Sequence, residues 1–116
     1  MYASSLMFHT IPGKTGELEN ELQALVKFVS DAGAKNARIL HTHFASPVAA
    51  NVVFVQDAPD LATLEEQILR VTSNAKFQQW TKNVAPLLRQ SPNREIYLVI
   101  EQGQHRANQN SGASIK

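Results

Sequence analysis

The sequence predicts an α+β fold with the ferredoxin-like order βαββαβ, in which helices cover one face of a four-stranded antiparallel sheet. Two observations predict it: four short runs rich in apolar residues, and segments of helical periodicity that separate the first run from the second and the third from the fourth. The length of 116 residues is sufficient for one buried core. We therefore expect a single domain over residues 1–101 and a disordered polar tail over residues 102–116, where Gln, Asn, Ser and Gly predominate.

The N-terminal part of the chain predicts a strand followed by a helix. Residues Ser5–Thr10 are largely apolar and are followed by Ile11-Pro12-Gly13, which is typical of a turn. After Glu17, apolar residues recur at steps that place them on one helical stripe: Leu18, Leu22, Leu25, Val26 and Val29. Gly33 is a favourable residue for ending this helix.

The middle of the chain predicts an antiparallel strand pair and then two short helices. The strands are Ala37–Phe44 and Asn51–Gln56, and a connection containing Pro47 separates them. Asp60 is a favourable N-cap for a helix whose apolar face is formed by Leu61, Leu64, Ile68 and Val71. Ser73-Asn74 interrupts the helical pattern, which resumes with Phe77, Trp80 and Val84 until Pro86.

The last predicted strand, Glu95–Ile100, shares an unusual property with Asn51–Gln56. Within them, Asn51–Val55 and Ile96–Ile100 are apolar at nearly every position, whereas a strand with one face in water alternates apolar and polar residues. Both faces of the sheet therefore require cover, and the chain has no further element to cover the second face. We expect a homodimer in which two subunits pack sheet to sheet around a two-fold axis as a dimeric α/β barrel.

Several motifs carry a resemblance to a known superfamily. They are Ile11-Pro12-Gly13-Lys14 before an acidic helix, Gly33-Ala34 before Ala37-Arg38-Ile39-Leu40, and Lys76-Phe77-Gln78-Gln79-Trp80 followed by Val84-Ala85-Pro86-Leu87-Leu88. Over about Leu6 to Ile100 the chain resembles the dimeric α/β-barrel superfamily, specifically NIPSNAP-like and antibiotic-biosynthesis-monooxygenase-like proteins. These motifs concern architecture and say little about chemistry.

The resemblance also bears on cofactors. Haem-degrading members of the superfamily use a strand Asn, a Trp and a haem-ligating His, but Met7 lies near the position of that Asn and Thr81 stands at the position of that His. We therefore expect no haem and no other cofactor. Other members are cofactor-free oxygenases that act on aromatic or quinol-like substrates, and this activity stays open.

Composition and charge disfavour several other functions. A formal net charge of +1 supplies no field that would attract nucleic acid or a membrane surface. The strand order also serves RNA-binding modules, but Asn51–Gln56 has no charge and only one aromatic residue, Phe54. Residues Met1–Thr10 do not resemble a secretory signal, and the chain contains no Cys. We expect a cytoplasmic protein.

Candidate site residues follow from the alternation of strand faces. Alternation predicts that Leu6, Phe8, Ile96, Leu98, Ile100, Leu40 and Phe44 face the helices. It then directs a second set toward the barrel: Met7, His9, Ile39, His41, His43, Tyr97, Val99 and Glu101. His41 and His43 would share a face, but a metal site needs further ligands, so none is expected. Trp80 is on a stripe typical of a core, although aromatic rings also line pockets.

These residues support three hypotheses. In the first, a homodimer binds a small apolar or aromatic molecule in each barrel half, with His9, His41, His43, Tyr97 and Trp80 as candidate ligand-binding residues. In the second, the protein is a cofactor-independent monooxygenase in which His9, His41 or His43 accepts a substrate proton. In the third, the dimer is purely structural and side chains fill its barrel.

Overall fold

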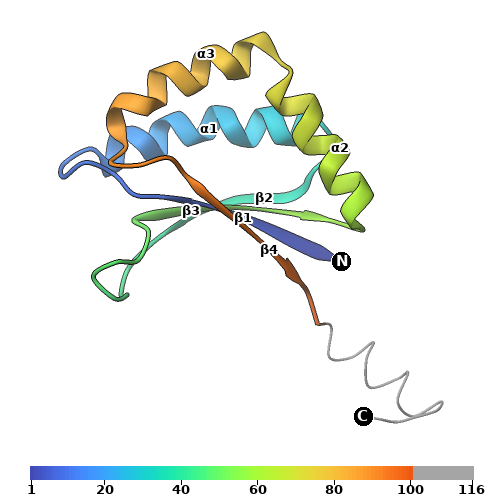
Figure 1. Ribbon diagram of the computed structural model, residues 1–116, viewed down its shortest axis with the longest axis horizontal. Helices are drawn as coiled ribbons and strands as arrows, with labels where there is room; N and C mark the ends of the chain where they lie inside the picture. The colour runs from blue at the N-terminus through green and yellow to red at the C-terminus, as the bar shows by residue number, and fades with distance from the viewer. Residues whose placement is uncertain (101–116) are drawn as a thin grey trace.

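The structure is a computed structural model, and it describes residues 1–100 of the chain. Four strands form one antiparallel sheet in the order β2-β3-β1-β4. All three α-helices lie on one face of this sheet (Figure 1). The elements in chain order are β1 (Tyr2–Phe8), α1 (Thr15–Asp31), β2 (Lys35–His41), β3 (Val52–Ala58), α2 (Leu61–Thr72), α3 (Ala75–Val84), a 3-10 helix (Ala85–Leu87) and β4 (Asn93–Leu98). The expected α+β, ferredoxin-like fold is confirmed.

Local sequence signals begin or end each of the three α-helices. The Asp60 side chain accepts a hydrogen bond from the Thr63 amide at 2.7 Å and caps α2. The Asn74 side chain accepts one from the Lys76 amide at 2.8 Å and starts α3. Gly33 follows α1 with φ of +102°, a conformation that glycine adopts without steric cost. The predicted interruption between α2 and α3 is therefore confirmed.

Strand boundaries differ from the prediction by two or three residues at several ends. The first strand is Tyr2–Phe8 rather than Ser5–Thr10, because Ala3 and Ser4 also pair with β3 despite their weak strand preference. The last strand begins at Asn93 and ends at Leu98. Residues 101–116, including Glu101 and the predicted tail, lie outside the described residues.

The hydrophobic core lies between α1 and the centre of the sheet. Leu18 and Leu22 are fully buried on the predicted helical stripe, where they form one cluster with Phe8, Val52 and Phe54 of the sheet. Burial of these large side chains supplies the main stabilisation of the two layers, at roughly 2 kcal/mol for each one.

The faces of β2 differ from the prediction, which placed Ile39 and His41 toward the barrel and Leu40 toward the helices. Ile39 lies opposite Phe54, a core residue, and packs against the core, whereas the Leu40 side chain points to the open face and is 47% exposed. A shift of one residue in the pairing register moves every side chain of a strand to the opposite face. Because Ile39 and Leu40 are adjacent and both apolar, the hydrophobic pattern does not decide between the two registers. A register shift between Lys35 and Arg38 accompanies φ of +54° at Asn36.

Phe44 and His43 were also assigned to this strand, but β2 ends at His41. Phe44 lies in the connection to β3 and is 90% exposed. The prediction that it faces the helices is therefore wrong.

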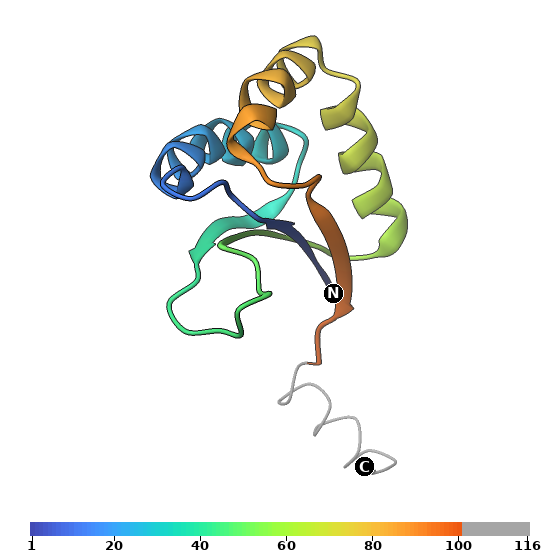
Figure 2. The same ribbon diagram turned by 60° about the vertical axis from the view of Figure 1, so that its left-hand side comes forward.

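Within residues 1–100 no helix lies on the second face of the sheet (Figure 1), although Ser5 and Val55 at its centre are buried. Among the residues on this open face, Leu40 and Tyr97 are each about half exposed, and Val53 is partly exposed. The edge strand β4 is exposed along its whole length (Figure 2 shows it at the border of the sheet). In the described part of the chain, no helix is long and apolar enough to cross a membrane.

Candidate functional site

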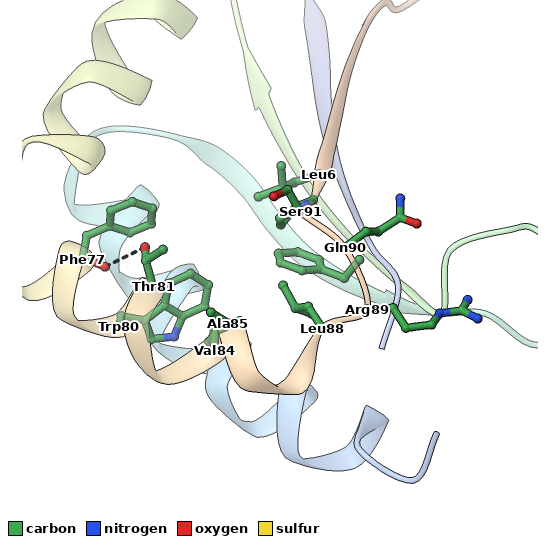
Figure 3. A pocket seen from close by; sticks show the side chains of 12 residues that line it. Leu6, Phe77, Trp80, Thr81, Val84, Ala85, Leu88, Arg89, Gln90 and Ser91 are labelled. Atoms are coloured by element: carbon green, nitrogen blue, oxygen red, sulfur yellow. Dashed lines mark hydrogen bonds between the residues drawn. The ribbon is translucent and has the colours of Figure 1, made fainter. Parts of the chain in front are cut away.

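A pocket of about 280 Å³ opens between α3, β1 and the segment that leads to β4. Its walls are apolar and come from Leu6, Phe8, Phe77, Trp80, Val84 and Leu88 (Figure 3). Thr81, Arg89, Gln90 and Ser91 supply polar groups at its border. We call this cavity the Trp80 pocket. An apolar lining with a few polar groups is typical of a site for a small organic molecule.

Trp80 is held rigidly in the wall of this pocket. Its indole Nε1 donates a hydrogen bond of 2.8 Å to the backbone carbonyl of Glu21, which ties α3 to α1. The Trp80 ring also stacks on Phe77, with 5.6 Å between ring centroids and 24° between planes. Phe77 in turn meets Phe28 edge to face. Trp80 is thus a core residue, as its helical spacing predicted, and at the same time part of a pocket.

The candidate histidines do not line the Trp80 pocket. His9 Nε2 lies 3.2 Å from the Val48 carbonyl oxygen in the connection between β2 and β3. His41 is on the helix side of the sheet, where its Nδ1 lies 2.5 Å from Glu19 Oε2 of α1. His41 therefore does not lie on the barrel face, where alternation predicted it, because it shares the helix side of β2 with Ile39.

His41 and His43 do contribute to one common feature, a wide hollow of about 390 Å³ beside the connection between β2 and β3. His43 lies there against the ring of Phe44, with 4.5 Å between ring centroids. Within residues 1–100, no group of three or more His, Asp or Glu side chains is arranged to hold a metal ion.

Tyr97 lies on the open face, as predicted, because it pairs with Ala3 on the side opposite Leu6. Its hydroxyl donates a hydrogen bond to Glu95 Oε1, and this bond raises the pKa of Tyr97. This pair is separated from the Trp80 pocket by the sheet.

Sequence reasoning missed the segment Leu88–Pro92, which closes the Trp80 pocket on one side. It also missed Arg94, which lies on β4 opposite Leu6 and so on the helix side of the sheet. If the predicted strand Glu95–Ile100 is extended by two residues toward the N-terminus, it includes Arg94. Alternation then places Arg94 on the same face as Ile96.

Comparison with solved structures identifies proteins of similar architecture. A NIPSNAP domain protein from Burkholderia xenovorans has a TM-score of 0.67 and 18% identity, covering 86% of this chain and 95% of its own. A candidate antibiotic biosynthesis monooxygenase from Bordetella bronchiseptica has a TM-score of 0.66 and 16% identity, covering 86% and 97%. A similar candidate from Nitrosomonas europaea has a TM-score of 0.65 and 14% identity, covering 87% and 100%.

The chain has the fold of these proteins. The resemblance to NIPSNAP-like and antibiotic-biosynthesis-monooxygenase-like proteins is thereby confirmed for the fold. No protein family model matches the chain, and no curated protein matches it significantly.

Proposed function

We propose that the protein binds a small aromatic molecule in the Trp80 pocket and that it does so as a homodimer. The observation that carries the binding proposal is the pocket itself, whose aromatic walls Phe77 and Trp80 are fixed by stacking and by the bond to Glu21. A preformed apolar cavity binds a planar apolar ligand without having to reorganise.

The dimer proposal is supported by the open face of the sheet. This face presents Leu40, Val53 and Tyr97 to solvent on the side away from the helices. A second copy packed face to face would remove these side chains from water, and a two-fold axis makes such a contact self-complementary.

Ligand binding can be measured through Trp80, because it is the single Trp of the chain. We expect 1,4-naphthoquinone to quench its fluorescence in a saturable manner. Thr81→Phe places a ring in the pocket and should weaken binding about tenfold or more, since overfilling a packed site costs about 1–3 kcal/mol. Gln79→Phe is the matched control, because Gln79 is also exposed on α3 but does not line the pocket. Equal affinity of wild type and Thr81→Phe would contradict the proposal.

Oligomeric state can be measured by light scattering at micromolar concentration. We expect about twice the chain mass of 12.8 kDa. Leu40→Glu should shift the protein toward a monomer, because it introduces two charges into the dimer contact. Leu69→Glu, an equally polar change at a site on α2 that is 65% exposed, should leave the dimer intact. A wild-type monomer would refute the dimer.

A cofactor-independent monooxygenase is the second candidate, and the candidate monooxygenases among the solved structures of this fold favour it. In such a reaction 1,4-dihydroxynaphthalene and O2 would yield 2-hydroxy-1,4-naphthoquinone and water, with the substrate supplying the electrons. Autoxidation instead yields 1,4-naphthoquinone and hydrogen peroxide, so product analysis separates the two.

The structure suggests how this second candidate should behave. The Trp80 pocket has no His, Asp or Glu among its described lining residues, so His9→Ala and His41→Ala should affect turnover less than Thr81→Phe does. Formation of the hydroxylated product by wild type but not by Thr81→Phe would support the enzyme. Autoxidation products alone would restrict the protein to binding.

A further inference from the structure

A cationic side chain lies beside the Trp80 pocket, in the space between the helices and the sheet. Arg94 pairs with Leu6 across β1 and β4, and cross-strand partners share a face, so its side chain extends on the helix side. Its Nη1 donates a hydrogen bond of 2.5 Å to Ser4 Oγ, and Ser4 is almost fully buried. This hydrogen bond connects the guanidinium to the surface of the sheet.

No anion accompanies this cation in the described part of the chain. Arg38 and Arg70 have carboxylate partners, Asp57 and Glu66, but no Asp or Glu within residues 1–100 forms an ion pair with Arg94. Arg94 as a residue is exposed to solvent, while partial desolvation of its guanidinium by surrounding protein lowers the pKa of that group. A partly desolvated cation with no ion-pair partner among residues 1–100 favours binding of an anion.

The position of Arg94 connects it to the proposed ligand site. It lines a small recess of about 30 Å³ together with Gln56, Ile68 and other residues of the sheet and helices. Leu6 and Phe77 line this recess and also the Trp80 pocket, so the two cavities are neighbours that share walls. A recess of this size holds a group comparable to one or two water molecules. A carboxylate group has a volume of that order, whereas an aromatic ring is too large for the recess.

We propose that the ligand of the Trp80 pocket is an aromatic acid whose carboxylate is bound by Arg94. This inference rests on the proposed binding function and adds the chemical class of the ligand. The guanidinium has five N–H donors, and the bond to Ser4 uses one of them. The remaining donors are sufficient for a two-point contact with a carboxylate, the geometry that arginine favours. The aromatic part of the ligand then lies against Phe77 and Trp80.

Arg89 is the other cation near the pocket, and it is the alternative partner for a carboxylate. It lines the border of the Trp80 pocket, but Figure 3 shows its side chain directed away from Phe77 and Trp80. Arg94, unlike Arg89, lies in the recess next to the aromatic walls. Arg70 of α2 lines neither of these two cavities and forms an ion pair with Glu66, so Arg70→Gln is the control for the loss of one positive charge.

Isothermal titration calorimetry with two probes of equal shape tests the proposal: biphenyl-4-carboxylate and the neutral biphenyl-4-carboxamide. We expect wild type to bind the carboxylate more tightly than the amide. Arg94→Gln should weaken carboxylate binding about tenfold or more, because a hydrogen bond to a charged group is lost. The same variant should change amide affinity by no more than about twofold, which also demonstrates that it is folded. Arg70→Gln should leave the preference for the carboxylate unchanged, because Arg70 lines neither the Trp80 pocket nor the recess.

Three outcomes would overturn the inference, and they differ from failure of the proposed function. Equal binding of the two probes by wild type, equal weakening of both probes by Arg94→Gln, or loss of the preference in Arg89→Gln or Arg70→Gln would each refute the role of Arg94 while leaving the apolar pocket intact. If neither probe binds wild type, the inference fails, and quenching of Trp80 fluorescence by 1,4-naphthoquinone decides separately whether the proposed function fails as well.

Discussion

The hydrogen bond between Trp80 and Glu21 makes a quantitative prediction about how the pocket wall is held. In Trp80→Phe the donor disappears and a smaller ring remains in the wall. The lost hydrogen bond contributes about 1 kcal/mol. The missing apolar atoms contribute about 1 kcal/mol more, close to the value for one buried CH2 group. We therefore expect the free energy of unfolding to fall by about 2 kcal/mol, a substantial part of the 5–15 kcal/mol typical of a domain.

Urea denaturation followed by far-ultraviolet circular dichroism measures this loss, because Trp80→Phe removes the fluorescence signal. Protein concentration must be equal in all samples, since association would raise apparent stability. Glu21→Gln is the control: the acceptor is the backbone carbonyl, which this change preserves, so the loss should stay within about 0.5 kcal/mol. A loss below about 0.5 kcal/mol in Trp80→Phe, or an equal loss in the control, would refute the role given to this bond.

Three further changes test other parts of the fold. Leu22→Ala should lower the free energy of unfolding by about 3 kcal/mol in urea denaturation, because Leu22 is fully buried in the core. Gly33→Ala should lower it by roughly 1–2 kcal/mol, since φ of +102° strains any residue with a Cβ atom. Asp60→Ala should lower the melting temperature at pH 7 by removing the cap of α2. The Thr63 hydrogen bonds lower the pKa of Asp60 in the folded protein, so its contribution is present above pH about 4 and is lost as pH falls further.

Each of these predictions has an outcome that contradicts it. A Leu22→Ala variant as stable as wild type would mean that α1 is not packed on the sheet as described. An unchanged Gly33→Ala variant would contradict the left-handed end of α1. For Asp60, the informative comparison is Asp60→Asn, which retains a capping oxygen without a titrating group. A difference between wild type and Asp60→Ala that is as large at pH 3 as at pH 7 would contradict the assignment of the pH dependence.

Local signals in the sequence determined the elements and most of the fold. The α1 stripe, the Asp60 cap, the interruption at Asn74 and the stop at Gly33 each depend on the backbone preference or periodicity of a few neighbouring residues. These preferences act within a single helix or strand, so the element can be predicted without knowing what it packs against. The order of the elements then restricted the topology to a few choices, of which the observed sheet is one.

The candidate site depended on information that no single segment contains. Ile39 and Leu40 are both aliphatic and similar in size, so the sequence does not show which of them faces the core. The pairing of Ile39 with Phe54 decides it, and His41 lies on the helix side because it is two residues from Ile39. The Trp80 pocket and Arg94 combine residues from α3, β1, the Leu88–Pro92 segment and β4. What the sequence by itself determined was therefore the set of elements and the rigid aromatic stripe. Only the tertiary structure decided which side chains meet, because register and layer packing are set by contacts between segments far apart in the chain.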